Sequence, residues 1–149
     1  MKLLIINGPN LNMLGIREPD IYGRETYRGL CEYIENHAKT LNVEVDIYQS
    51  NSEGDIVTRI QQAYGHVDGV VINPAAYTHT SVAILDALKA VAIPAVEVHL
   101  SDINQREDFR HISYAGMACE AHYVGLGFEG YTRAMEYLVD KYGDKTTDN

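Results

Sequence analysis

Residues 2–7, KLLIIN, and residues 69–73, GVVIN, decide the fold that we predict for this chain. Both are unbroken apolar runs of strand length, which is typical of parallel strands covered by helices on both faces. Three further β-rich runs, at 43–49, 94–100 and 121–127, alternate with segments whose apolar residues recur at helical spacing. Five strand–helix units in so short a chain predict a doubly wound parallel sheet with helices on both faces.

The expected helices follow from apolar stripes between the strands and after the last one. Their apolar positions are Tyr27, Leu30, Cys31, Ile34, Ala38 and Leu41; Ile56, Ile60, Ala63 and Tyr64; Ile84, Leu85 and Leu88; and Tyr131, Met135, Leu138 and Val139. The sequence NSEGD at 51–55 precedes the second helix, and Gly143 ends the last. We therefore predict an α/β fold of the flavodoxin-like type, a five-stranded sheet of order 2-1-3-4-5. It forms a single domain over residues 1–142, followed by a polar tail over 143–149.

Charge and cysteine content limit the possible binding partners and the cellular compartment of the protein. The chain has 149 residues and a formal net charge of −9, which argues against nucleic acid but not against a small anionic substrate in a locally positive cleft. Cys31 and Cys119 form no CxxC or zinc spacing, and we interpret them as buried thiols in a reducing compartment. No signal-peptide pattern opens the chain, and no apolar run reaches the roughly 20 residues of a membrane span. We therefore expect a cytoplasmic protein that does not bind membranes.

Polar side chains gather where the predicted strands end. Ligands of such a sheet bind beyond the carboxyl ends of the strands, where the winding reverses. The ends of the first, third and fourth strands and the segments that follow them offer Asn10, Arg17 and Tyr22; Asn73 and His79; and Glu97, His99, Ser101, Arg106 and Arg110. None of the five lysines follows a strand, which argues against imine chemistry, and no HExxH motif or carboxylate cluster favours a metal. The set favours cofactor-free acid/base chemistry on a small anionic, hydroxylated molecule.

Two other functions stay open from the residues alone. The sequence GLGFEG at 125–130 matches the dinucleotide fingerprint, although no strand follows it, and we interpret its glycines as close helix–sheet packing. A flavin- or nucleotide-binding module on the same fold is therefore one alternative. A metal-dependent hydrolase that uses His79, His99 and Glu97 is the other.

Five longer motifs carry a resemblance to a known family. They are NGPNLNMLGIREPDIYG (7–23), QSNSEGDIVTRIQ (49–61), NPAAYTHTSVAILDAL (73–88), EVHLSDINQREDFR (97–110) and GLGFEGY (125–131). In order and spacing they resemble type II 3-dehydroquinate dehydratase over nearly the whole chain, from residue 2 to about residue 142. The clearest departure is Ala75, where the family also uses Gly.

The resemblance implies an activity, an assembly and a set of site residues. The family loses water from 3-dehydroquinate to give 3-dehydroshikimate without a metal or organic cofactor, and it assembles as a homododecamer of trimers. By position, the base is Tyr22, the acid is His99 and the activating arginine is Arg17. Asn10 matches a residue that holds a water near the enolate oxygen, and Asp86 one that reaches into a neighbouring subunit's site. Substrate contacts fall on Asn73, His79, Leu100, Ser101 and Arg110.

The chemistry explains why these residue types are needed. A tyrosine has an ordinary pKa of about 10, so a phenolate base needs a nearby cation, and we expect Arg17 to keep Tyr22 partly ionised. His99 would protonate the departing hydroxide while Glu97 fixes its tautomer. Residues 15–23 would form a lid that closes over the site. Whether the reaction serves biosynthesis or quinate breakdown stays open.

Overall fold

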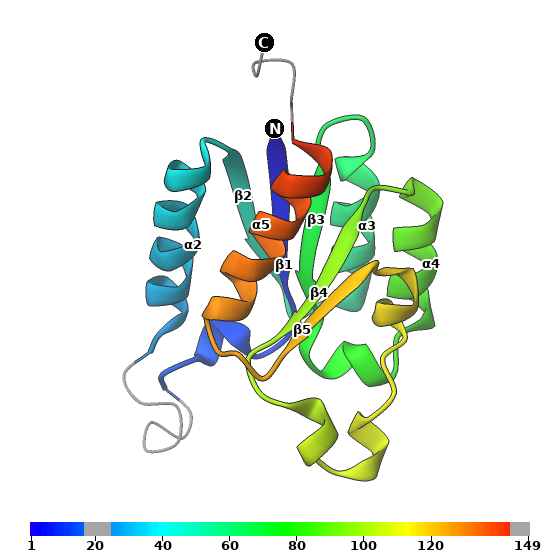
Figure 1. Cartoon of the computed structure of the whole chain (residues 1–149). Coiled ribbons are helices and arrows are strands. Elements are labelled where there is room, and N and C mark those ends of the chain that lie inside the picture. The colour runs from blue at the N-terminus through cyan, green and yellow to red at the C-terminus, as the bar shows by residue number, and fades with distance from the viewer. Residues whose placement is uncertain (17–24, 144–149) are drawn as a thin grey trace.

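The computed structural model describes residues 1–16 and 25–143, and five of their segments form one parallel sheet (Figure 1). The strands are β1 (Lys2–Asn7), β2 (Glu44–Gln49), β3 (Gly69–Asn73), β4 (Ala95–His99) and β5 (Ala121–Val124). Their order, β2-β1-β3-β4-β5, confirms the predicted topology. The winding reverses between β1 and β3, which run side by side so that Asn7 pairs with Asn73 at their ends.

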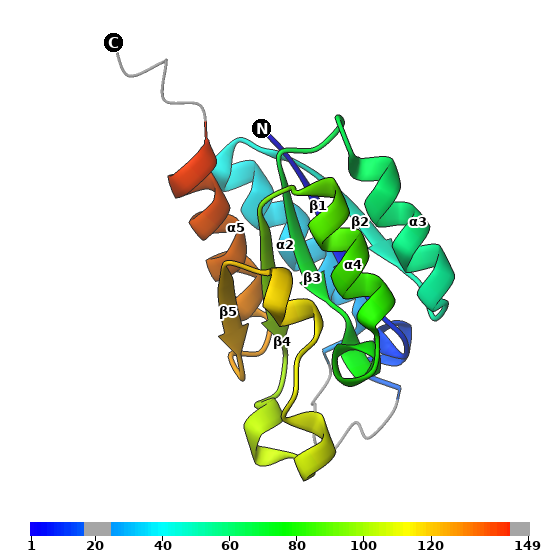
Figure 2. The same ribbon diagram turned by 90° about the vertical axis from the view of Figure 1, so that its right-hand side faces the viewer.

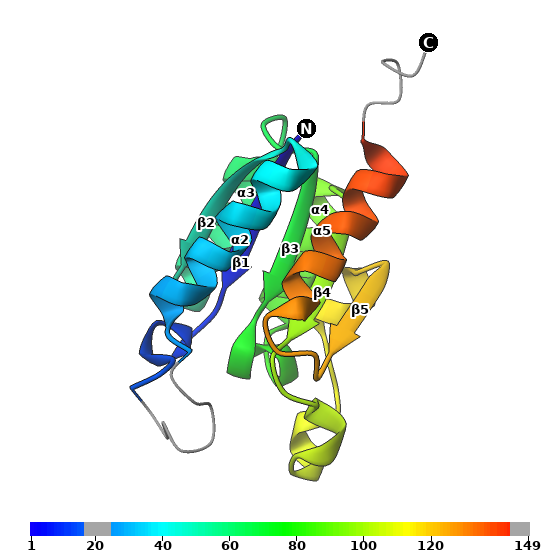
Figure 3. The same ribbon diagram turned by 60° about the vertical axis from the view of Figure 1, so that its left-hand side comes forward.

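Helices cover the sheet on both faces. They are α2 (Tyr27–Leu41), α3 (Glu53–Ala63), α4 (Val82–Val91) and α5 (Glu129–Tyr142). Helices α3 and α4 lie on the face that Figure 2 turns toward the viewer, and α2 and α5 cover the opposite face (Figure 3). Five short 3-10 segments complete the chain: η1 (Leu11–Met13), η2 (Ala75–His79), η3 (Ile103–Gln105), η4 (Asp108–Arg110) and η5 (Ala115–Ala118).

The alternation of side chains along β1 shows why its apolar run is unbroken. Leu3 and Ile5 pack against α2 and α5, whereas Leu4 and Ile6 pack against α3 and α4. All four are fully buried. Because both faces of a central parallel strand are covered, residues 3–6 of β1 are all apolar, as the sequence predicted.

Side-chain caps fix where three of the helices begin. The hydroxyl of Thr26 accepts a hydrogen bond from the backbone N–H of Gly29 before α2, and Ser52 and Ser81 cap α3 and α4 in the same way. Such caps satisfy backbone N–H groups that the helix itself leaves unpaired. At the end of α2, Asn42 adopts a left-handed φ of 56°, which closes the helix before β2.

Some local expectations were wrong. Helix α3 ends at Ala63, so Tyr64 lies beyond its apolar stripe and is 69% exposed. Strand β5 ends at Val124, and Gly125 and Gly127 adopt positive φ values of 79° and 58°, so these two glycines make the turn after the strand. Only Gly130 fits the expected role in packing, because a Cβ there would lie 3.1 Å from Cγ1 of Val98.

The polar strand ends face one end of the molecule. Figure 1 shows η1, η2, η3 and η4 at the carboxyl ends of β1, β3 and β4.

Both cysteines are only partly buried, contrary to expectation. In the part of the chain that the structure describes, no helix is long and apolar enough to cross a membrane.

Candidate active site

A pocket of about 460 Å³ opens at the carboxyl ends of β1, β3 and β4. It lies beside the point where the sheet winding reverses, which is where ligands bind to sheets of this type. The expected site residues that line it are Asn10, Asn73, His79, His99, Leu100, Ser101, Arg106 and Arg110. Three loops that are distant in the sequence therefore meet at one cavity, as the strand order predicted.

The pair Glu97 and His99 is built by the alternation of β4. Val98 points into the core under α2 and α5, so its two neighbours both point to the other face of the sheet. There Nε2 of His99 lies 2.8 Å from Oε2 of Glu97, and both residues are buried. With Nε2 held by the carboxylate, Nδ1 is the ring nitrogen that remains to exchange a proton with a bound molecule.

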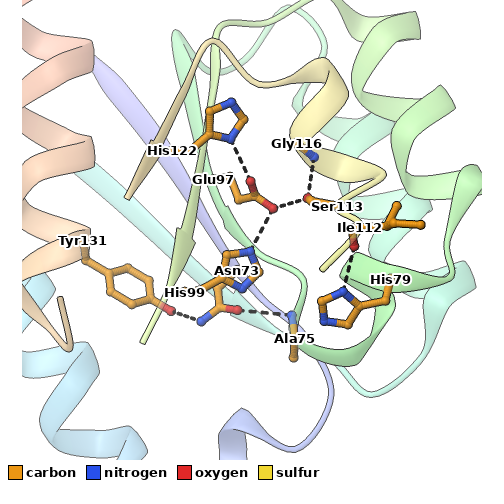
Figure 4. A network of polar contacts seen from close by, with 10 residues as sticks. All are labelled: Asn73, Ala75, His79, Glu97, His99, Ile112, Ser113, Gly116, His122 and Tyr131. Carbon is orange, nitrogen blue, oxygen red and sulfur yellow. Dashed lines mark hydrogen bonds and ion pairs between the residues drawn. The ribbon is translucent and has the colours of Figure 1, made fainter. Parts of the chain in front are cut away.

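Two further side chains hold Glu97 (Figure 4). The hydroxyl of Ser113 donates a hydrogen bond to Oε2, and Nδ1 of His122 lies 2.7 Å from Oε1. Ser113 in turn accepts a hydrogen bond from the backbone N–H of Gly116. A Cβ at Gly116 would lie 2.7 Å from both Oε1 of Glu97 and Oγ of Ser113, so only glycine fits there without a shift of this network.

These contacts decide the charge of the buried carboxyl. Burial by itself would raise the pKa of Glu97, but hydrogen bonds from His99 and Ser113, the charge of His99 and the hydrogen bond from His122 lower it to about 2. Glu97 is therefore a carboxylate at neutral pH. A fixed negative charge of this kind holds the His99 ring in one orientation.

Asn73 is held by a second buried network. Its Nδ2 donates to the hydroxyl of Tyr131, which donates to Oδ1 of Asn7 at 2.6 Å. Its Oδ1 accepts from the backbone N–H of Ala75 at 3.1 Å. Figure 4 shows Asn73 between these two partners. Because an amide nitrogen carries two hydrogens, one N–H of Asn73 remains for a ligand in the pocket.

Asn10 is positioned by its backbone. It adopts a left-handed φ of 70°, and its N–H donates to Oδ1 of Asn51 at 3.0 Å. The carbonyl of Asn51 accepts from the hydroxyl of Tyr77 at 2.7 Å, which ties the segments after β1, β2 and β3 together. Sequence reasoning missed Asn51, although it lies within one of the motifs quoted above.

Two further polar side chains of the pocket already form hydrogen bonds within the protein. Nδ1 of His79 lies 2.7 Å from the carbonyl oxygen of Ile112, and Nε of Arg110 donates to Glu107 at 2.7 Å. Burial lowers the pKa of His79, so this ring is neutral near pH 7 and donates its Nδ1–H to the carbonyl. Sequence reasoning missed Glu107, which reduces the positive charge that Arg110 brings to the pocket.

Comparison with known proteins identifies the family. The family model described as Dehydroquinase class II matches residues 1–139. The chain belongs to this family. A 3-dehydroquinate dehydratase of Clostridium acetobutylicum is 51% identical over 138 residues, which cover 93% of this chain and 96% of the relative. A type II dehydroquinase of Butyrivibrio crossotus has a crystal structure that superposes with a TM-score of 0.89 at 54% identity, over 93% of this chain and 97% of that one.

The name of one further relative specifies a metabolic direction. A protein named catabolic 3-dehydroquinase 1, from Fusarium vanettenii, is 51% identical over 138 residues and covers 93% of this chain and 96% of its own. Likeness at this level therefore leaves the metabolic direction open.

Two of the expected site residues that the structure describes, Glu97 and Asp86, do not line the pocket of this class II dehydroquinase. Arg17, Tyr22 and most of the expected lid lie outside the described residues. Asp86 is exposed on α4, away from the pocket of its own chain. Among residues 1–16 and 25–143, no group of three or more His, Cys, Asp or Glu side chains is placed to hold a metal ion.

The lowered pKa of Glu97 gives this dehydroquinase a predicted acid dependence of stability. The folded-state value of about 2 lies below the ordinary 4.5, so the contribution of Glu97 is fully present above pH 4.5 and is lost as the pH falls through 2. Each proton that the unfolded state binds in excess of the folded state changes the free energy of unfolding by about 1.4 kcal/mol per pH unit. Glu97→Gln should therefore flatten this fall, measured by urea unfolding across the range.

The matched control is Glu35→Gln, because Glu35 is an exposed glutamate on α2. It should keep the wild-type dependence on pH. Parallel curves for the wild type and Glu97→Gln would contradict the assignment of a lowered pKa to this carboxyl.

Proposed function

We propose that this class II dehydroquinase removes water from 3-dehydroquinate to give 3-dehydroshikimate, a step of the shikimate pathway, by acid/base elimination through an enolate. The observation that carries the proposal is the buried Glu97–His99 pair, 2.8 Å apart, at the edge of a pocket lined by amide, hydroxyl and guanidinium groups. The names of the curated relatives agree with this reaction.

The reaction requires a base, an acid and donors for an enolate. A base removes the proton next to the ketone, and we assign this role to the phenolate of Tyr22, with Arg17 as the cation that keeps it partly ionised. Negative charge then develops on the ketone oxygen, where preorganised donors are often the largest catalytic contribution. We assign a bound water held by Asn10 to that position.

His99 completes the elimination. The C–O bond to the tertiary hydroxyl breaks, its electron pair leaves with the oxygen, and His99 donates the proton that turns hydroxide into water. Glu97, held as a carboxylate, stabilises the imidazolium before this step and orients its ring. His99 must be protonated again before the next turnover, by solvent or by the proton that the base collected.

The substrate is held by neutral donors and cations. We assign its carboxylate to the free N–H of Asn73 and the backbone N–H groups of Leu100 and Ser101, which line the pocket. Arg110 and His79 remain for the ring hydroxyls, and Arg106 adds positive charge at the rim. These contacts orient the ring between base and acid, which lowers the entropic part of the barrier.

The assembly and the location of the enzyme are proposals as well. We propose a homododecamer of trimers in the cytoplasm, with Asp86 contributing to the site of a neighbouring subunit. The exposed position of Asp86 on α4 leaves it available for such a contact. Sedimentation velocity would test the assembly.

The proposed reaction is tested by adding 3-dehydroquinate and following the ultraviolet absorbance of the conjugated product. We expect turnover that persists with borohydride, since an imine intermediate would be trapped, and after exhaustive chelation. Loss of turnover with borohydride would contradict the enolate mechanism, and loss on chelation would favour the metal-dependent hydrolase class. A flavin or nucleotide released on denaturation would favour the binding-module alternative. Absence of product would refute the proposed function itself.

A further inference from the structure

The backbone pairing of β4 and β5 places a second imidazole on Glu97. Glu97 and His122 are direct partners in the register of the two strands, so their side chains project from the same face of the sheet. Nδ1 of His122 lies 2.7 Å from Oε1 of Glu97, and Nε2 of His99 lies 2.8 Å from Oε2. One carboxylate therefore bridges two histidines, each on its own oxygen.

The two histidines differ in their surroundings. His99 is buried and lines the pocket, whereas the side chain of His122 is 47% exposed. Figure 4 shows Glu97 between the two rings, with His122 on the side away from His79. His122 does not line the pocket. His122 can therefore exchange protons with solvent while a substrate covers His99. The proposed reaction assigns no role to this residue.

We propose that His122 is a positioning residue that controls, through the shared Glu97 carboxylate, how readily His99 gives its proton to the leaving hydroxyl. This inference rests on the proposed function for the role of His99. The proton that breaks away in the reaction is still that of His99, and it still ends on the departing oxygen as water. His122 contacts neither that oxygen nor any group that reacts.

The physical basis is competition for one negative charge. A hydrogen bond from neutral His122 draws charge toward Oε1, and a protonated His122 neutralises much of it. Either effect weakens the stabilisation of the His99 imidazolium by the carboxylate, and this makes the Nδ1–H of His99 a stronger acid. Removing His122 leaves Ser113 as the other donor to Glu97 and more of the carboxylate's charge facing His99, which then keeps its proton more tightly and protonates hydroxide less readily.

Few other ionisable groups face this cluster within the described residues. Cys119, which follows η5, lies close enough to feel the charge of Glu97, but burial raises the pKa of its thiol to about 12, so it is neutral. His79, from η2, carries a lowered pKa and is neutral as well. Glu120 precedes His122 on the chain, but its carboxylate is bound to Tyr142 and Lys141. The pH response of His99 should therefore follow His122.

The test combines two variants with two measurements. His122→Asn keeps a hydrogen-bond donor near the position of Nδ1 but cannot become charged, and His122→Ala removes the donor. In histidine-labelled enzyme, the nitrogen resonances of His99 should titrate in two coupled steps in the wild type and in one step in both variants. In His122→Ala the midpoint should move upward by roughly half to one pH unit.

Kinetics should report the same change. With His122→Ala, kcat should fall roughly three- to tenfold while KM stays within about twofold. The alkaline limb of the curve of kcat against pH should move to higher pH together with the midpoint of the His99 titration. His122→Asn should retain more of kcat than His122→Ala. If His122 had a merely structural role, its removal would change KM or thermal stability and leave the alkaline limb of the pH profile in place.

The matched control is His37→Asn, because His37 forms another imidazole–glutamate pair, with Glu136 at 3.1 Å between α2 and α5. It should leave both the His99 titration and the pH–rate profile unchanged. If His122→Ala also leaves both unchanged, the inference is overturned. If the wild type does not dehydrate 3-dehydroquinate while the coupled titration is present, the proposed function fails and the link between the two rings stands.

Discussion

Replacing His99 with glutamine should lower kcat for 3-dehydroquinate by roughly 10²–10⁴ and leave KM within a few-fold. Glutamine keeps a polar amide that can donate to Glu97, so the buried carboxylate, which holds His99 at 2.8 Å in the wild type, retains a partner. It cannot supply a proton to the departing hydroxyl. The loss should therefore lie in the chemical step, measured by initial rates over a range of substrate concentrations.

The control for this substitution is His111→Gln, in which an exposed histidine after η4 is changed in the same way. It should retain nearly the wild-type kcat. His99→Gln that dehydrates the substrate at the wild-type rate would remove His99 from the role of acid. A large rise in KM with unchanged kcat would instead assign His99 to substrate binding.

The strands, and the edge of the sheet at which the candidate site lies, could be predicted from the sequence because the decisive signals are local. Apolar runs mark β1 and β3, alternation places Glu97 and His99 on one face of β4, and parallel strands end at one edge. No knowledge of distant contacts is needed for these steps. A pocket lies at the ends of β1, β3 and β4, the edge of the sheet at which these steps place the site.

The groups that hold the site residues in place could not be predicted, because they arrive from distant segments. Ser113 and His122 reach Glu97 from 16 and 25 residues further along the chain, and Tyr131 reaches Asn7 from 124 residues away. A serine in a loop and a histidine in a strand carry no signal of such a contact in the sequence. Their function becomes visible only when β5 and α5 are packed against the sheet.

Ala75 shows how the structure explains a departure from the family pattern. Its φ is 53°, in the left-handed region that glycine adopts without strain and alanine adopts at a cost of roughly 1 kcal/mol. Its N–H nevertheless donates to Oδ1 of Asn73, so the contact that orients this amide is kept. The substitution therefore affects the backbone energy of the loop rather than the groups that face the pocket.

Tyr22→Phe should lower kcat by roughly 10²–10⁴ and leave substrate binding within a few-fold, because the phenol oxygen is the proposed base and the ring is kept. Two tyrosines that hydrogen-bond to Asn7 at the end of β1 are poor substitutes for it. Burial raises the pKa of Tyr27 to about 12 and also raises that of Tyr131, so neither forms a phenolate near neutral pH. Tyr27→Phe is therefore the matched control and should retain most of the activity.

The pH profile separates the base from the cation that activates it. If Arg17 lowers the pKa of Tyr22, Arg17→Gln should lower the maximal rate severely and move the rising, acidic limb of the profile to higher pH, because the active form is the phenolate. Tyr22→Phe should abolish that limb in whatever activity remains. An Arg17→Gln profile that coincides with the wild type would disprove the activation, and a Tyr22→Phe enzyme that turns over normally would assign proton abstraction to another residue. A loss of activity in Arg17→Gln with the limb in place would mean that the guanidinium binds the substrate instead of tuning the base.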